Sequence, residues 1–277
     1  ADTIAIGAPV EPTNQTTVTN GLSFSTDTGL LYSGAGYVFS RTGSNWSQQA
    51  FLKSSIAQFL DYSGYDLSIS KDSVVVGSHC SDPLNQLALL GKQDQTGLCV
   101  ASGAALVYKR TSTTWAEESI LMPDNAVGGD YFGASVEISD ATMVVGAMGE
   151  DSAQTTITNG STSSTDLSLQ NSGAVYVFNR LGSAWIQEAY LKAPNAHSDD
   201  WFGGSLSLSG NRMVVGMPAE RSAQTTITNG ASASSDMSAF DSGAAYVFKR
   251  TNSLWTAEAY IKASNAESGD SFGTVAI

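Results

Sequence analysis

Cysteine, histidine and basic residues are scarce in this chain of 277 residues. It has 2 cysteines, 2 histidines and 13 lysine and arginine residues against 26 acidic residues, which gives a formal net charge of −13. Proteins that bind duplexes or other polyanions neutralise phosphates with Lys and Arg, so the composition argues against a nucleic-acid partner. Charged residues make up 14% of the chain and hydrophobic residues 42%. This balance excludes a disordered chain and predicts a buried core under a weakly charged surface.

Long apolar runs are missing as well. No stretch reaches the roughly 18 to 20 apolar residues that a membrane-spanning helix requires, and no charged and apolar leader precedes Ala1. We therefore expect no membrane insertion and a secreted or cell-surface protein whose signal peptide has been removed. The two cysteines, Cys80 and Cys99, share one polar segment and predict a disulfide that staples a loop in an oxidising compartment.

The sequence repeats itself four times with a period of about 69 residues. An arginine lies five residues before each of four regularly spaced tryptophans. The string SAQTTITNG occurs at 152–160 and again at 222–230. A fixed period predicts structural units that bury their apolar faces by stacking on one another. The tryptophans that mark the repeats are Trp46, Trp115, Trp185 and Trp255.

Each repeat has the alternation of β-strands and no helical period. The third copy illustrates the pattern, with strands expected at 173–178, 185–193, 202–209 and 212–217. Gly and Asn at 180–183 and 209–211 suit tight hairpin turns. Four strands in each of four copies predict an all-β protein.

Repeated four-stranded antiparallel units are typical of β-propeller blades, which leave only short edges exposed. We therefore predict one β-propeller domain over residues 1–277, with four four-stranded blades. The chain begins with DTIAIGAP, the counterpart of RMVVGMPA at 212–219, and ends with FGTVAI, the counterpart of FGASVEI at 132–138. The N- and C-terminal strands are accordingly expected to pair and close one blade.

These residues resemble the FG-GAP repeats of integrin alpha-chain propellers and their bacterial relatives. FG occurs at 132–133, 202–203 and 272–273, and GAP or GAM at 7–9 and 146–148. The resemblance implies that the FG strand is innermost, followed by the GAP strand, the GAVYVF strand and the Trp strand at the rim. Integrin-like propellers usually have seven blades, so a small ring and a piece of a larger one both stay open.

The resemblance does not extend to the calcium loops of that family. The turns at the corresponding place read SDA at 139–141, SGN at 209–211 and SKD at 70–72. They are too short and too poor in carboxylates for the six to eight oxygens that calcium prefers. We therefore expect no cofactor and keep calcium as the alternative.

No residues have the spacing of a catalytic centre. The chain lacks a GxSxG elbow, an HExxH helix, a phosphate-binding loop and a CxxC pair, so we predict no catalytic residues and no enzymatic activity. One aspartate precedes the FG strand in every copy, and we interpret it as a turn cap, with a ring of carboxylates around a cation as the weaker alternative. These four residues are Asp61, Asp130, Asp200 and Asp270.

Long connections between the second and third strands are the most informative segments. They lie at 10–32, 79–101, 149–171 and 219–241, and connections of this length are usually functional. Strand direction places them on the same face as the connections between repeats. They either fold back over the blade or form a recognition surface for a partner.

Candidate binding and modification residues lie in or near these connections. In the second copy the connection is bracketed by the cysteines and carries Leu87, Leu89 and Leu90, a candidate docking patch. Tyr62, Tyr131 and Trp201 are aromatic candidates for stacking on sugar rings. Sequons at Asn14, Asn45 and Asn159 are candidate glycosylation sites.

We predict a non-catalytic extracellular or cell-surface module for interaction, adhesion or assembly, which uses the Ser/Thr-rich loops of one face. A glycan-binding propeller is the first alternative and an accessory domain of a secreted enzyme the second. The expected partner is a protein or a glycan at the cell surface, and self-assembly is left open.

Overall fold

A computed structural model describes residues 2–23, 25–82 and 102–277. The described residues form four antiparallel sheets of four or five strands and no helix, which confirms the predicted all-β class. They group into two compact units, Ala1–Met122 with Ala126–Ile138, and Pro123–Asn125 with Ser139–Ile277. Each unit is described by itself, and one domain over 1–277 stays a prediction. No helix able to cross a bilayer occurs in this described part of the chain.

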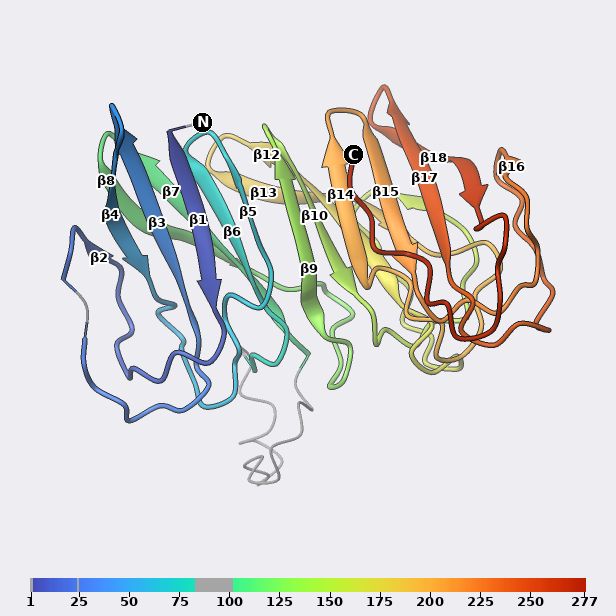
Figure 1. Cartoon of the computed structure of the whole chain (residues 1–277), viewed down its shortest axis with the longest axis horizontal. Coiled ribbons are helices and arrows are strands. Elements are labelled where there is room, and N and C mark those ends of the chain that lie inside the picture. The colour runs from blue at the N-terminus through green and yellow to red at the C-terminus, as the bar shows by residue number, and fades with distance from the viewer. Residues whose placement is uncertain (1, 24, 83–101) are drawn as a thin grey trace. The chain divides into compact units, whose positions relative to one another are not determined.

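The first unit holds two sheets (Figure 1). The first sheet runs in the order β1-β3-β4-β2 and the second in the order β5-β6-β7-β8. Strand β9 (Phe132–Ser139) begins in this unit. The strands of the first sheet are β1 (Thr3–Ala8), β2 (Thr19–Asn20), β3 (Ala35–Thr42) and β4 (Asn45–Leu52). Those of the second are β5 (Leu67–Ser70), β6 (Ser73–Ser78), β7 (Ala104–Thr111) and β8 (Thr114–Leu121).

The second unit also holds two sheets. In the third sheet β11, β13, β12 and β10 are neighbours, and the fourth runs β14-β15-β17-β18-β16. The third sheet contains β10 (Thr142–Ala147), β11 (Thr158–Asn159), β12 (Ala174–Leu181) and β13 (Ala184–Leu191). The fourth contains β14 (Ser205–Ser209), β15 (Arg212–Met217), β16 (Thr228–Asn229), β17 (Ala244–Thr251) and β18 (Leu254–Ile261).

The strand order agrees with the expected sequence of FG, GAP, GAVYVF and Trp strands in the second and fourth sheets. The long connections add a strand that the periodicity does not predict. Residues of the TTVTNG or TTITNG strings form β2, β11 and β16, each of which pairs with the Trp strand of its own sheet. These connections therefore return to the edge of the sheet instead of forming loops throughout.

The predicted closure of one blade by the two chain ends is not found among the described residues. Strand β1 has β3 as its one hydrogen-bonded strand, and residues 273–277 form no strand. The amides of Val275 and Ile277 donate instead to the side-chain hydroxyls of Ser205 (3.2 Å) and Ser207 (3.0 Å) beside β14.

Each unit buries an apolar core between its two sheets. In the first unit Val38 and Leu52 pack in one cluster with Val76 and Leu106 of the second sheet. In the second unit Val177 and Leu191 pack in one cluster with Val215 and Tyr246. Successive residues of a strand point to opposite faces of its sheet. In each unit, the sheet that comes first in the chain therefore uses one set of alternate residues for this contact, and the sheet that follows uses the other set.

A repeated polar junction accompanies each of these cores. The side chain of Asn20 from β2 accepts from the backbone N–H of Trp115 (2.7 Å) and donates to its carbonyl (3.1 Å). The Trp115 indole N–H donates to Gln49 (2.7 Å). In the second unit Asn159 holds the Trp255 backbone in the same way (2.7 and 3.2 Å), and the Trp255 indole donates to Glu188 (2.9 Å). The TNG string is therefore an inter-sheet clamp.

The constant spacing of arginine and tryptophan has a local cause. Arg110 and Trp115 are cross-strand partners in the β7–β8 hairpin, and the guanidinium lies 5.3 Å from the centre of the indole ring. The same pair in the third copy, Arg180 and Trp185, is 4.5 Å apart. A cation over an aromatic face stabilises such a pair and orients the tryptophan of the hairpin.

A buried ion pair occurs in three of the four copies. Lys192 donates to Glu150 (2.6 Å) and Ser172 (2.7 Å), and Tyr190 donates to the other oxygen of Glu150 (2.7 Å). Lys262 repeats this arrangement with Glu220, and Lys53 forms the ion pair with Glu11, but in that copy Phe51 takes the place of the tyrosine. The second copy replaces the three residues Glu150, Tyr190 and Lys192 together, by Ser81, Ile120 and Met122.

Replacing Lys192 alone should destabilise the second unit. Lys192→Met leaves the Glu150 carboxylate buried without its cation, which typically costs about 3–5 kcal/mol. The triple variant Glu150→Ser, Tyr190→Ile, Lys192→Met installs the residues of the second copy and should recover most of this loss. Urea unfolding of the three proteins measures both effects. A Lys192→Met variant as stable as the wild type would contradict this assignment.

Candidate functional site

The four aspartates that precede the FG strand act within their own turns. Asp61 accepts from the backbone N–H of Gln58 (2.6 Å), Asp130 from that of Val127 (2.9 Å) and Asp200 from that of His197 (2.7 Å). Asp270 repeats the bond with Glu267 (2.8 Å) but is exposed. This geometry is that of the turn cap expected from the sequence. Within the described ranges no group of three or more His, Cys, Asp or Glu residues is placed to hold a metal ion.

Burial changes the acidity of two of these aspartates. The side chains of Asp61 and Asp200 are almost fully buried, and this desolvation raises the pKa of each to about 7. Between roughly pH 4, where an unfolded aspartate titrates, and pH 7, the folded protein therefore binds more protons than the unfolded chain. Stability contributed by each protonated group is complete below that window and is lost as the pH rises through it.

Asp200→Asn should flatten this part of the pH profile. An amide is neutral at every pH in the window and its oxygen can still accept from the His197 N–H. We expect the melting temperature of the wild type to fall more steeply between pH 4 and 7 than that of the variant. The exposed counterpart supplies the control, because Asp270→Asn should leave the slope unchanged. Equal slopes in all three proteins would show that Asp200 is ionised throughout.

Aromatic side chains gather at the end of the first unit where the long connections emerge. The rings of Tyr32 and Tyr62 are 5.5 Å apart, and His79 lies 5.9 Å from Tyr62, 4.3 Å from Tyr65 and 6.3 Å from Tyr131. Tyr32 and Tyr65 are 41% and 56% exposed. Burial lowers the pKa of His79 to about 4, so its imidazole is uncharged at neutral pH and packs as a ring.

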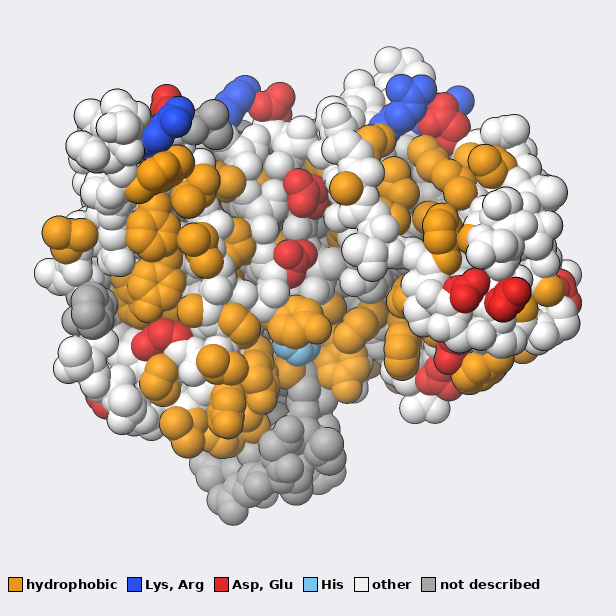
Figure 2. Space-filling view, viewed as in Figure 1, with side chains coloured by type: hydrophobic (Ala, Val, Ile, Leu, Met, Phe, Trp, Pro, Cys, Tyr) orange, Lys and Arg blue, Asp and Glu red, His pale blue; other side chains and the backbone are white. Residues whose placement is uncertain are grey.

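Exposed apolar residues extend this group. Leu31 is 51% and Phe59 48% exposed, and the backbone of Leu60 is bonded to that of Leu31 (3.2 Å). Figure 2 shows hydrophobic side chains gathered around the visible histidine at this end of the unit. We call this surface the loop-face patch, formed by Leu31, Tyr32, Phe59, Tyr62, Tyr65, His79 and Tyr131.

The turn backbone holds two of these rings in position. Tyr62 and Tyr131 have left-handed φ values of 53° and 56°, a conformation that bulky residues adopt only when the surrounding structure imposes it. The amide of Tyr62 donates to the carbonyl of Tyr32 (2.8 Å). Trp201 in the second unit has the same conformation, at 59°, and its amide donates to Asn171 (3.1 Å). The backbone at this repeat position therefore has the same conformation and the same hydrogen bond in both units, whether the residue is tyrosine or tryptophan.

Comparison between copies separates the patch from the scaffold. At the positions of Leu31 and Tyr32 the third copy has Gln170 and Asn171, and at that of Phe59 it has Ser198. Tyr65 and His79 replace small residues and Pro or Met of the other copies: Ala134, Gly204 and Thr274 for the first, and Pro9, Met148 and Pro218 for the second. Four patch residues are thus departures from the repeat, Tyr32, Phe59, Tyr65 and His79, whereas Leu31, Tyr62 and Tyr131 stand at positions that are apolar or aromatic in other copies as well.

The other predicted site residues have varied locations. Trp201 is 45% exposed in the second unit, and Leu87, Leu89 and Leu90 lie outside the described residues. Cys80 is buried next to β6, but its predicted partner Cys99 also lies outside the described part, so the disulfide stays a prediction. The patch brings together two predicted residues, Tyr62 and Tyr131, with others that periodicity analysis missed. Their signal was the break in the repeat at Tyr65 and His79.

The three sequons differ in their availability. Asn14 and Asn45 are exposed. Asn159 is exposed too, but its amide donates to the Trp255 carbonyl. A glycan on that nitrogen would break the inter-sheet clamp, so the structure favours Asn14 and Asn45 over Asn159.

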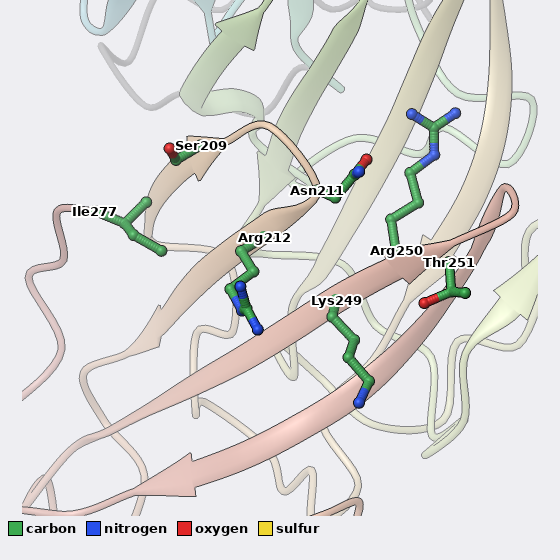
Figure 3. Close-up of a pocket in the computed structure, with 7 residues that line it drawn as sticks. All are labelled: Ser209, Asn211, Arg212, Lys249, Arg250, Thr251 and Ile277. Atoms are coloured by element: carbon green, nitrogen blue, oxygen red, sulfur yellow. The ribbon is translucent and has the colours of Figure 1, made fainter.

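A shallow pocket of about 350 Å³ lies in the second unit, between the ends of β15 and β17 (Figure 3). Its arginines are paired with carboxylates, Arg212 with Glu258 (2.9 Å) and Arg250 with Glu188 (2.5 Å). Figure 3 shows Arg250 pointing away from Arg212 and Lys249. Both arginines are therefore engaged by carboxylates of the protein. Their side chains do not point toward a common position where one anion would bind.

The pattern of the FG-GAP repeat family matches residues 115–178 and 185–248. This chain contains FG-GAP repeats. Each matched FG-GAP segment begins at the tryptophan of one copy and runs through the GAVYVF strand of the next, so it includes both an FG strand and a GAP strand. The prediction of FG-GAP repeats is therefore confirmed. No curated protein matches the chain.

Proposed function

We propose that the four sheets are blades of a β-propeller and that the protein is a non-catalytic adhesion or assembly module at the cell surface or outside the cell. FG-GAP repeats supply a rigid scaffold of stacked sheets. The expected four-bladed ring belongs to this proposal, which rests on the family and on the four equivalent sheets.

The loop-face patch is the observation that supports a binding role. Leu31, Tyr32, Phe59 and Tyr65 are each at least 41% exposed at positions where the third copy is polar or small. Scattered apolar residues need no explanation, but a contiguous group that replaces polar ones is typical of a protein interaction site. Tyrosine and phenylalanine also contribute strongly to such interfaces. We therefore propose a protein partner for this surface.

Glycan binding is the second candidate. It is favoured by the exposed rings of Tyr65 and Trp201, which are 56% and 45% exposed and lie beside the long connections of their units. Flat apolar faces of sugars stack on such rings. This alternative requires that Trp201, which lies outside the patch, contributes to binding.

Copy-swap variants test the proposal on intact cells of the source organism. Tyr32→Asn with Phe59→Ser gives the patch the residues of the third copy, which the fold already accommodates. Burial of one aromatic ring contributes about 1.5–3 kcal/mol, so binding of the labelled protein to cells should weaken at least about tenfold. The matched control, Phe240→Gln, changes an exposed ring of the second unit (58% exposed) and should bind like the wild type.

Two results would overturn the protein-partner proposal. Equal cell binding by the patch variant and the wild type would show that the patch is not used. Binding to a defined glycan array that is abolished by Trp201→Ser and unaffected by the patch variant would establish the glycan alternative instead.

A further inference from the structure

Arg221 is the one basic residue at its position in the repeat. The other copies have Pro12, Asp82 and Asp151 there. The nine residues that follow Arg221, SAQTTITNG at 222–230, are identical to the nine that follow Asp151. The arginine therefore stands in front of a segment that occurs twice in the second unit, once with this residue and once without it.

The Arg221 side chain makes contacts on three sides. One of its terminal nitrogens donates to the carbonyl of Ser198 (2.8 Å). The guanidinium lies 4.9 Å from the centre of the Phe240 ring, which is 58% exposed. The Nε atom lies 3.8 Å from Oδ1 of Asp200, in the turn before β14. This last separation is too long for a hydrogen bond, so Arg221 and Asp200 form an ion pair without one.

Both atoms of this ion pair are buried and lack a hydrogen-bond partner among the described residues. The Asp200 side chain is fully buried, and its other oxygen, Oδ2, accepts from the backbone N–H of His197 (2.7 Å). A buried donor or acceptor without a partner costs free energy. A small movement of the arginine would satisfy the Nε–H and the carboxylate oxygen together.

The charge of Asp200 decides how favourable that movement is. Burial raises the pKa of its carboxyl group to about 7, so the group is neutral in mildly acidic and ionised in mildly alkaline solution. A hydrogen bond from a guanidinium to an ionised carboxylate is much stronger than one to a neutral group. The titratable and charged groups that face Asp200 are His197 and Asp199 of its own turn, Glu220 and Arg221 after β15, and Tyr246 and Tyr260 of β17 and β18. Of these groups, only the arginine carries a positive charge at every pH.

We propose that Asp200 and Arg221 form a pH-operated latch between the turn before β14 and the long connection at 219–241. When Asp200 is ionised, the Nε–H of Arg221 donates to Oδ1 and the latch is closed. When Asp200 is protonated, the latch is open and the arginine keeps its contacts with Ser198 and Phe240. The latch lies within the second unit and requires no partner, so the inference is independent of the proposed function.

The latch and the global stability respond to pH in opposite directions. Ionisation of Asp200 lowers the free energy of unfolding, because water solvates the carboxylate better than the folded protein does. Within the folded protein, however, the ionised carboxylate attracts Arg221 more strongly than the neutral one does. The connection after Arg221 should therefore become more ordered as the pH rises, while the melting temperature falls.

Amide exchange in the two identical strings tests the latch with an internal control. The amides of Ala223 and Ala153 donate to equivalent aspartates, Asp236 (2.8 Å) and Asp166 (2.7 Å). These hydrogen bonds lower the pKa of both aspartates, so both stay ionised near neutral pH. Each alanine follows a serine, which gives the two amides the same intrinsic exchange rate at any pH.

NMR measures the exchange of both amides in one sample of the full chain. Between about pH 6 and pH 8, the protection of Ala223 relative to that of Ala153 should increase about tenfold, the effect of one hydrogen bond between charged groups. Asp200→Asn cannot ionise and Arg221→Gln lacks the guanidinium, so the ratio should be independent of pH in each variant. His197→Gln removes the imidazole beside Asp200 but keeps the backbone N–H, and it should behave like the wild type.

The wild-type measurement alone can overturn the proposal, because both amides belong to the same folded molecule. A ratio that does not change with pH would show that no latch closes. A change of the wild-type size that persists in Asp200→Asn or Arg221→Gln would also contradict the proposal. Loss of the change in His197→Gln would assign the pH response to the histidine instead of to Asp200.

Discussion

The junction between the two sheets of each unit is the interaction on which the rest of this structure depends. In each unit both sheets turn an apolar face toward one another, and the burial of these faces is favourable. The apolar contact supplies most of the stabilisation but does little to fix how one sheet is oriented on the other. The register of one sheet on the other is fixed by two polar contacts. An asparagine is hydrogen-bonded to the tryptophan backbone, and a Gln or Glu accepts from the indole N–H. Hydrogen bonds of this kind contribute modestly but exclude other arrangements.

The repeat explains which parts of the molecule could be predicted from sequence. Alternation and the Gly and Asn turns identify the strands because these signals are local. The RMVVGM segment, for example, is β15 with the predicted bounds. Strand order followed from the FG-GAP resemblance, and the turn role of the aspartates followed from their presence in every copy. Each of these inferences uses contacts within one repeat.

Contacts between distant residues were harder to infer. The function of the TTITNG string depends on residues about 95 positions apart, such as Asn159 and Trp255, and its verbatim repetition was the one available signal. The partners of Lys192 and Lys262 are glutamates 42 positions earlier, beyond the reach of strand periodicity. The pairing of the two chain ends was predicted only because they correspond to complementary parts of one repeat. That correspondence does not specify which backbone amides pair.

Departures from the repeat point to candidate binding residues better than the repeat itself does. The second copy lacks the buried Lys–Glu pair, and His79 and Tyr65 replace residues of other types in the same region. A scaffold residue is constrained by its neighbours in every copy, whereas a residue that differs in one copy is free of that constraint. Tyr32, Phe59, Tyr65 and His79 of the loop-face patch are such residues.

Indole hydrogen exchange measured by NMR on dilute protein tests the central claim most directly, because each tryptophan reports on its own junction. The account predicts strong protection for Trp115 and Trp255, whose indole N–H groups are hydrogen-bonded to the preceding sheet, and rapid exchange for Trp46. Similar exchange rates for these three indoles would contradict the repeated junction.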